Sequence, residues 1–303
     1  MTTVCVFGGT GFLGRRLVRR LAAEGATLRI AVRSPELAHN VLENTDMDRV
    51  MVLRADVRDP ASVAAAVAGV DAVVNAVSAY VEKRGASFES VHVQGARTLA
   101  QEAAAAGVAR LVLVSGIGAD PRSRSPYIRA RGRGELAASE AFPGATIVRP
   151  SAMFGPGDAL FGTLAGIARL LPVLPLIGGG RTRLQPVYVE DVAEAIARML
   201  AERASAGRTY ELAGPGVYSL RELVGFALRL IDKRRLLLPV PFAVAAIQAR
   251  LFELLPGAPL TTGQVDLLRT DNLASGALPG LRELDIRPKA IEDIVPTYIG
   301  RRR

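Results

Sequence analysis

Cysteine, lysine and long uncharged apolar runs are all scarce in this chain of 303 residues. Its single cysteine, Cys5, excludes an internal disulfide framework and suits a reducing compartment. No charge-poor apolar run reaches the roughly twenty residues that a membrane-spanning helix needs. No signal peptide fits before the first predicted strand. We therefore expect a cytoplasmic protein that is either free or peripheral on the inner face of the cytoplasmic membrane.

Arginine carries almost all of the positive charge of this chain. The formal net charge is +9, and only Lys83, Lys233 and Lys289 among the 38 basic residues are lysines. Apart from the tail 301–303, the basic residues are scattered and no aromatic residues alternate with them, so we expect no nucleic-acid platform. An anionic membrane surface or an acidic protein partner fits the charge better. No Cys/His cluster and no Ser-His-Asp constellation stands out, which argues against metal sites and hydrolytic chemistry.

The strongest motif is a glycine turn between a short apolar strand and a helical run, at residues 4–21. Gly8 permits the tight turn, Gly11 lets the backbone approach a pyrophosphate, and Gly14 lets the helix pack against the strand. The helix N-terminus directs unpaired N–H groups and a partial positive charge at the anion. The cofactor-binding residues predicted in this turn are Gly8, Thr10, Gly11, Phe12, Leu13 and Gly14.

Further apolar strands alternate with helical segments along the first half of the chain. The predicted strands cover residues 27–32, 50–55, 70–75, 110–115 and 145–150. This alternation predicts an α/β fold with a doubly wound parallel sheet of the Rossmann type, which places its ligands at the carboxyl ends of the strands.

Arg33 follows the second predicted strand, 19 residues beyond Gly14. NAD-specific folds place an acid there for the ribose, and NADP-specific folds place an arginine for the 2′-phosphate. No carboxylate lies beside Arg33. The sequence therefore favours NADP(H) over NAD(H).

The spacing Gly-x-x-Gly-x-x-Gly resembles that of the extended and atypical short-chain dehydrogenase/reductases. This resemblance implies that Asp56 and Val57 contact the adenine ring, although Asp56 also precedes a helix cap at Asp59. It further implies that the turn after the fourth strand lies along the cofactor, with Asn75 and Ser78 as its counterparts, although the family's usual glycines are missing there. The loop that follows Pro150 would border the nicotinamide.

Tyr127 and Arg131 stand where that superfamily has its catalytic Tyr-x-x-x-Lys, a spacing that puts both side chains on one helix face. In the family, the lysine lowers the tyrosine pKa and holds the ribose, while a serine at the position of Ser115 orients a carbonyl. Arginine supplies charge and hydrogen bonds, but its planar fork does not fill the space of an ammonium group. Two readings stay open: either Arg131 is a working substitute, or Tyr127 and Arg131 only hold nucleotide.

Several segments together resemble the atypical subgroup that contains the nucleotide-binding accessory subunit of respiratory complex I and its bacterial relatives. They are residues 7–14, 140–143, 147–151, 154–155 and 185–189. The resemblance implies bound NADPH with a structural purpose and partners among the membrane-bound subunits of a respiratory complex. We predict a nucleotide-binding core at 1–158, an apolar segment facing a cleft or a membrane at 159–183, a return to the core at 184–213, and a smaller, mainly helical C-terminal lobe at 214–303.

The C-terminal lobe contains a run of twelve apolar residues, 236–247, which is too short to span a bilayer. An amphipathic helix is predicted to follow at 248–255, and Lys233, Arg234 and Arg235 precede the run. The apolar, basic lobe could lie on a membrane surface, fill a groove of a protein partner, or pack over the cleft.

Three functions remain open from the sequence. The first is an NADPH-binding accessory or assembly protein of a membrane respiratory complex. The second is an NADPH-dependent reductase, dehydrogenase or isomerase acting on an apolar carbonyl substrate such as a quinone precursor, an isoprenoid or a sterol. Its catalytic residues would be Ser115, Tyr127 and Arg131. The third is a regulator that senses NADP(H) and passes the signal to a protein partner.

Overall fold

The chain folds into two compact units, each with its own apolar core. The computed structural model describes residues 2–38, 49–83, 85–253 and 260–300. Unit 1 consists of Met1–Pro150, Val189–Glu211 and Ala277–Ile286, and unit 2 consists of Ser151–Tyr188, Leu212–Gly276 and Arg287–Arg303.

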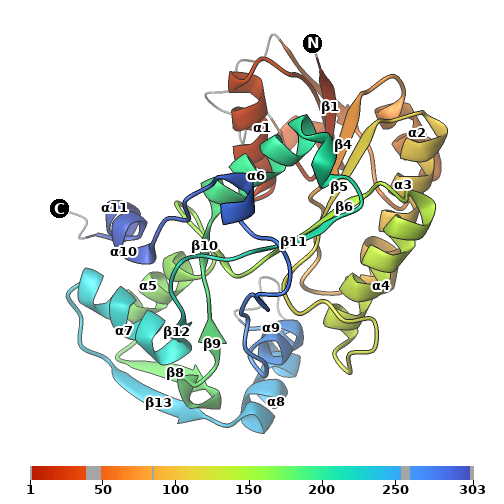
Figure 1. Cartoon of the computed structure of the whole chain (residues 1–303). Coiled ribbons are helices and arrows are strands. Elements are labelled where there is room, and N and C mark those ends of the chain that lie inside the picture. The colour runs from red at the N-terminus through yellow and green to blue at the C-terminus, as the bar shows by residue number, and fades with distance from the viewer. Residues whose placement is uncertain (1, 39–48, 84, 254–259, 301–303) are drawn as a thin grey trace. The chain divides into compact units, whose positions relative to one another are not determined.

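Unit 1 is built around a seven-stranded sheet (Figure 1). Its strand order is β11-β6-β5-β4-β1-β2-β3, and the neighbours from β6 to β3 are all parallel. The predicted strands are all present, within two residues at either end. The strands are β1 (Thr3–Phe7), β2 (Thr27–Val32), β3 (Val50–Arg54), β4 (Ala72–Asn75), β5 (Arg110–Val114), β6 (Thr146–Pro150) and β11 (Thr209–Leu212).

Helices cover both faces of this sheet, which confirms the predicted Rossmann-type fold. On one side α1 (Gly14–Ala23) contacts α6 (Val189–Ala201), and on the other α2 (Pro60–Val67), α3 (Gly95–Ala105) and α4 (Pro126–Ala141) contact one another in sequence (Figure 1). A π-helical segment at Glu89–Gln94 leads directly into α3. Apolar residues of β1, α2, α3 and β5 form one buried cluster, so burial of these apolar side chains holds the layers together.

The order of the sheet reverses between β1 and β4. Successive strands run outward from β1 through β2 to β3, and outward from β4 through β5 to β6. The chain segments that leave the carboxyl ends of β1 and β4 therefore turn in opposite directions. The crevice that this leaves at the carboxyl ends of the two strands is where such sheets bind their ligands. Gly8 follows β1 and Ala76 follows β4, so the glycine turn lies at this position.

Two glycines inside α4 let this helix approach its neighbours closely. A Cβ on Gly134 would lie 2.1 Å from the carbonyl oxygen of His92, and one on Gly132 would lie 2.4 Å from the nitrogen of Pro121. Glycine costs about 1 kcal/mol inside a helix relative to alanine. The close packing of α4 on the π-helical segment and on the loop before it offsets this cost.

Unit 2 combines short helices with three two-stranded sheets. Its sheets pair β7 (Met153–Phe154) with β10 (Val187–Tyr188), β9 (Arg183–Leu184) with β12 (Tyr218–Ser219), and β8 (Val173–Ile177) with β13 (Leu236–Val240). Its main helices are α5 (Phe161–Leu170), α7 (Leu220–Leu230), α8 (Phe242–Phe252) and α9 (Thr262–Leu267), and the short helices α10 (Ile291–Ile294) and α11 (Pro296–Ile299) follow near the C-terminus.

The apolar run at 236–247 is divided between a strand and a helix. Its first five residues form β13, and α8 begins at Phe242 rather than at the predicted residue 248. Pro241 explains the early start, because proline fits the position just before a helix and cannot continue a strand ladder. Among the described residues, no helix is long and apolar enough to cross a membrane.

The close packing of α4 gives a prediction. Gly134→Ala should lower the thermal unfolding temperature because the added methyl group meets the His92 carbonyl, and overpacking of this kind costs roughly 2 kcal/mol. Gly166→Ala in α5 is the control, since its Cβ would meet nothing within 4 Å and should stabilise that helix by up to about 1 kcal/mol. Thermal unfolding followed by circular dichroism measures both. Equal effects of the two substitutions would contradict the packing argument.

Candidate functional site

The glycine turn after β1 forms a tight cradle at the N-terminus of α1. Gly8 has φ of +80°, and a Cβ there would come within 2.8 Å of the Ala76 carbonyl oxygen. A Cβ on Gly14 would lie 2.1 Å from the Gly8 carbonyl oxygen. The amide of Gly11 donates to that same oxygen at 2.9 Å, and Gly11 itself is exposed. The backbone can fold this tightly only because these positions lack side chains.

The N-terminus of α1 has the features of an anion site. No side chain caps this helix, and its first turn carries no acidic residue. Its first N–H groups and the positive end of its dipole therefore suit a phosphate. Leu13 is buried in the turn, whereas Phe12 and Thr10 are partly exposed, and Phe12 lies under the Arg16 guanidinium with 4.3 Å to its ring centre.

Gly9 is a further required glycine that the sequence motif does not indicate. A Cβ on Gly9 would lie 2.6 Å from a methyl group of Ile30 and 3.4 Å from one of Val18. Gly9 therefore lets the turn pass between β2 and α1. Only the doubled glycine at positions 8 and 9 could have pointed to it.

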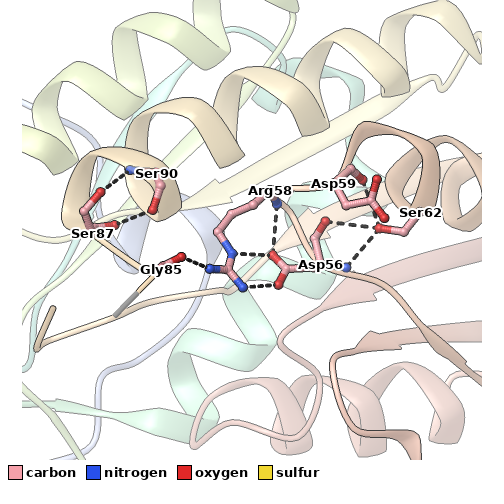
Figure 2. Close-up of polar contacts among 7 residues, drawn as sticks. All are labelled: Asp56, Arg58, Asp59, Ser62, Gly85, Ser87 and Ser90. Atoms are coloured by element: carbon pink, nitrogen blue, oxygen red, sulfur yellow. Dashed lines mark hydrogen bonds and ion pairs between the residues drawn. The ribbon is translucent and has the colours of Figure 1, made fainter. Parts of the chain in front are cut away.

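Two arginines lie near Asp56 at the carboxyl ends of β2 and β3. Figure 2 shows that the Arg58 guanidinium donates hydrogen bonds to the Asp56 carboxylate and to the Gly85 carbonyl oxygen. Arg58 donates to Asp56 from its Nε at 2.9 Å and from its backbone N at 3.0 Å. These hydrogen bonds, with a smaller effect of the Arg33 charge, lower the pKa of Asp56 below its usual range. The exposed Arg33 makes no hydrogen bond or ion pair with another described residue.

Four other predicted cofactor residues have structural partners. Val57 is buried against α3, where it contacts Gly95. The buried Asn75 accepts a hydrogen bond from the Val77 amide and so fixes the turn after β4. Ser78 lies in the same turn, and the buried Pro150 accepts a hydrogen bond from the Ile117 amide at 3.1 Å.

Tyr127 and Arg131 meet on the buried side of α4. Nη1 of Arg131 donates to the Tyr127 hydroxyl at 3.0 Å and to Ser78 Oγ at 3.1 Å, and its Nη2 donates to the Val114 carbonyl at 3.3 Å. Only 9% of Arg131 is exposed. The guanidinium thus links α4, the end of β5 and the turn after β4. A lysine ammonium has a single nitrogen and could not occupy the positions of both Nη1 and Nη2.

Aromatic rings surround Tyr127. Tyr80 stacks on it at 5.5 Å between ring centres, while Phe88 and His92 meet it edge-on at 5.5 and 5.6 Å. The Tyr80 side chain is half exposed, but the charge of the neighbouring Tyr127 hydroxyl and the burial of its own hydroxyl raise the pKa of Tyr80 to about 12. The sequence pattern did not point to Tyr80 or Phe88, because neither belongs to the Tyr-x-x-x-Arg motif. Their positions depend on how the loop before α3 folds back onto α4.

A small cavity beside this cluster contains two buried polar atoms that have no hydrogen-bond partner within the described part of the chain: the Ser115 hydroxyl and Arg131 Nε. Asn75 and His92 also line the cavity. A buried polar group without a partner costs free energy, so these two atoms need a polar partner from outside the chain, which an ordered water or a hydroxyl or carbonyl group of a ligand supplies. The residues present therefore fit a dinucleotide, with its pyrophosphate at the glycine turn and its ribose or nicotinamide near Arg131 and Ser115.

A buried ion pair holds α4 against the sheet. Arg149 of β6 donates to the Glu135 carboxylate from Nε at 3.0 Å and from Nη2 at 2.6 Å. Glu135 lies one turn after Arg131 and is 7% exposed. Arg149 therefore positions the helix that carries Tyr127 and Arg131. Among the described residues, no group of His, Cys, Asp and Glu could hold a metal ion.

Known proteins resemble this chain over most of its length. Mitochondrial NADH dehydrogenase (ubiquinone) 1 alpha subcomplex subunit 9 of Arabidopsis thaliana is 36% identical over 299 residues, which cover 95% of this chain and 74% of that protein. Ceramide reductase of Caulobacter vibrioides is 35% identical over 190 residues, covering 63% of this chain and 58% of that protein.

Solved structures share the fold. The dTDP-glucose 4,6-dehydratase DesIV of Streptomyces venezuelae superposes with a TM-score of 0.76 and 24% identity, covering 98% of this chain and 96% of that one. Residues 4–213 match the NAD dependent epimerase/dehydratase family, and this span includes the glycine turn, Tyr127 and Arg131. The chain therefore belongs to the NAD dependent epimerase/dehydratase family.

Proposed function

We propose that this protein is an accessory or assembly component of an NADH:ubiquinone oxidoreductase, and that it binds NADP(H) in a structural role. Its partners would be subunits of the membrane-bound respiratory complex. It would lie in the cytoplasm, peripheral on the inner face of the cytoplasmic membrane. Several relatives are named as subunits of NADH dehydrogenase, which supports this role, and the Arabidopsis thaliana subunit aligns with 95% of the chain.

The observation that carries the proposal is the set of bonds made by Arg131. Its guanidinium is buried and tied at once to Tyr127, Ser78 and the Val114 carbonyl. A charge in this position stabilises the junction of three elements, and its remaining Nε can bind a ribose oxygen. Nucleotide that binds only the folded state adds its binding free energy to the stability of unit 1. A structural cofactor needs no more than this.

The basic residues at the ends of β2 and β3 support a preference for NADP(H). Arg58 neutralises Asp56, so the charge of this carboxylate does not repel a 2′-phosphate bound at Arg33. The charge of Arg33 lies close enough to contribute to the lowered pKa of Asp56, and the Arg33 side chain is exposed. Its guanidinium can form charge-assisted hydrogen bonds to a 2′-phosphate.

A specific observation favours a second function, reduction or oxidation of an apolar carbonyl or alcohol. The buried Ser115 hydroxyl has no hydrogen-bond partner among the described residues and faces the cavity beside Arg131. When bound, NADP(H) supplies or accepts the hydride at the carbonyl carbon. Tyr127 would give its proton to the carbonyl oxygen, and Ser115 would bind that oxygen. Arg131 would stabilise the negative charge left on Tyr127. Ceramide reductase is among the relatives.

His92 is a poor candidate for the proton donor in this second function. Burial, and then the charge of Arg131, lowers its pKa to about 4. At neutral pH the ring is therefore uncharged. Its Nε2 lies 3.0 Å from the Ala79 carbonyl oxygen and 3.3 Å from the Ala79 amide nitrogen. The backbone of Ala79 is therefore the partner of this ring nitrogen.

The first test is isolation of the tagged chain from gently solubilised membranes of the source cells. We expect respiratory-complex subunits to co-purify, and NADPH to be released when the protein is denatured. Mass spectrometry identifies both. A chain that purifies alone, with nucleotide that exchanges readily, would contradict the accessory role.

Two variants separate the accessory role from catalysis in the same preparation. Arg131→Lys replaces two donor nitrogens by one, so it should lose the bond to the Val114 carbonyl and lower the unfolding temperature under the accessory role, whereas an enzyme should keep or gain turnover with the lysine. Tyr127→Phe removes the proton donor. Loss of carbonyl reduction in Tyr127→Phe, with nucleotide retained, would establish the second function instead.

Arg33→Ala tests the cofactor preference. The wild type should bind NADPH at least roughly tenfold more tightly than NADH, because a charged hydrogen bond to phosphate contributes about 1.5–3 kcal/mol. Arg33→Ala should remove most of this difference and leave NADH binding unchanged. Arg208→Ala, at the start of β11 on the far edge of the same sheet, is the matched control. Isothermal titration measures the affinities of all three proteins for NADPH and NADH; an undiminished preference in Arg33→Ala would refute the assignment.

His92 should make stability depend on pH. Its folded pKa of about 4 lies below the usual value of 6.5, so the unfolded chain binds the proton more tightly between these values. This contribution to stability is complete above pH 6.5 and is lost as pH falls toward 4, by about 2 kcal/mol at pH 5. His92→Gln should flatten that part of the profile in thermal unfolding at pH 5 and 7.5. An unchanged pH dependence would show that other groups cause it.

A further inference from the structure

Large aliphatic side chains gather on part of the surface of unit 2. Of the thirteen large hydrophobic residues that are exposed in the described chain, eight come from the end of α5, from β8 and β13, and from α8. We call these eight residues the aliphatic face. They are Leu170, Leu171, Val173, Leu236, Leu238, Val244, Ile247 and Leu251.

The strand pairing of β8 with β13 brings five of these residues together. Leu236 lies opposite Val173, and Leu238 lies two residues along the same strand, opposite Pro175. Their neighbours Leu174 and Leu176 point to the other side and are buried in the core of unit 2. Leu170 and Leu171 lie directly before β8. The outer side of this ribbon is therefore as apolar as its inner side, although it faces solvent.

Helix α8 follows β13 after a single proline and repeats this arrangement. Val244, Ile247 and Leu251 are spaced by three and four residues, so they share one side of the helix. They are 44%, 61% and 60% exposed. The opposite side buries only alanines, Ala245 and Ala249, against Ile177, Val240 and Val265. Phe242 at the start of α8 also packs against this cluster, but the aliphatic side chains of Val244, Ile247 and Leu251 point outward, unlike those of an ordinary surface helix.

Basic residues border the aliphatic face. Lys233 and Arg234 precede β13, Arg169 lies at the end of α5, and Arg250 lies on α8. Arg235 is held by its Nε, which donates to the Ala168 carbonyl at 2.8 Å. Two acids lie in the same segments, Asp232 and Glu253, and Glu253 is bound to Thr262. The border is therefore positive overall.

We propose that the aliphatic face inserts into an anionic membrane surface. This inference deepens the proposed function and rests on its peripheral location, but it is carried by the residues of unit 2. Cores of protein interfaces are enriched in aromatic residues and methionine, whereas this face contains only leucine, isoleucine and valine. Aliphatic side chains with a basic border suit acyl chains next to anionic headgroups. The apolar side chains would insert among the acyl chains, and the basic residues would attract the anionic headgroups.

The test is flotation of the purified full-length protein with vesicles. The wild type should bind vesicles of phosphatidylcholine with added phosphatidylglycerol, bind phosphatidylcholine alone much less, and be released by salt. Leu238→Gln should weaken binding to the anionic vesicles by about tenfold. Leu136→Gln is the matched control, because Leu136 is 52% exposed and Leu238 is 51% exposed, and Leu136 lies on α4 in unit 1. The control should bind as the wild type does.

Removal of the basic border gives a second readout. Lys233→Gln with Arg234→Gln should weaken binding to the anionic vesicles roughly twenty-five-fold, since each surface charge contributes about fivefold, and should leave binding to neutral vesicles unchanged. Thermal unfolding checks that each variant is folded.

Three outcomes would overturn the proposal. They are no flotation of the wild type, equal losses in Leu136→Gln and Leu238→Gln, or a wild-type dimer in gel filtration that Leu238→Gln dissociates. The last result would show that a second copy covers the face. Flotation requires no other subunit. A chain that floats but does not co-purify with the respiratory complex would therefore refute the proposed function and leave the membrane face standing.

Discussion

The burial of one charge, the Arg131 guanidinium, constrains most of the structure around the candidate site. Arginine does not deprotonate in proteins, so its charge must be satisfied where it lies. Tyr127, Ser78 and the Val114 carbonyl supply the acceptors, and each belongs to a different element of unit 1. For these groups to meet, α4 must lie very close to its neighbours. The glycines at 132 and 134 allow that approach, and the Glu135–Arg149 ion pair fixes it.

All of the predicted nucleotide and catalytic residues lie in unit 1. The glycine turn, the basic ends of β2 and β3, the turn after β4 and the Tyr127–Arg131 pair all come from Met1–Pro150. Nucleotide binding can therefore stabilise this unit by itself, whatever unit 2 contacts. This separation suits a protein in which one unit holds the cofactor and the other faces a partner surface. It also explains why the two proposals, on nucleotide and on membrane, can be tested independently.

The sequence predicted the fold well because its signals were local. Strand and helix alternation is visible in short windows, and six of the seven strands of the main sheet were placed within two residues at either end, whereas β11 was not predicted. What the sequence did not indicate depends on contacts between distant residues. Gly9 is required because Ile30 and Val18 approach it, Gly134 because His92 does, and Tyr80 joins the site through a loop. The start of α8 was missed for a different reason: an unbroken apolar run carries no periodicity at the change from strand to helix.

The arginine bias of the chain has different consequences in different environments. At the border of the aliphatic face, exposed arginine and lysine both contribute one positive charge, and attraction to an anionic surface depends mainly on that charge. At position 131 the shape of the charged group determines which hydrogen bonds the side chain can make. A lysine ammonium is a compact donor that can turn from one acceptor to another, whereas the planar guanidinium bonds to several fixed acceptors at once. A choice between lysine and arginine that is neutral on the surface therefore matters at position 131, where the guanidinium joins a helix, a strand and a turn.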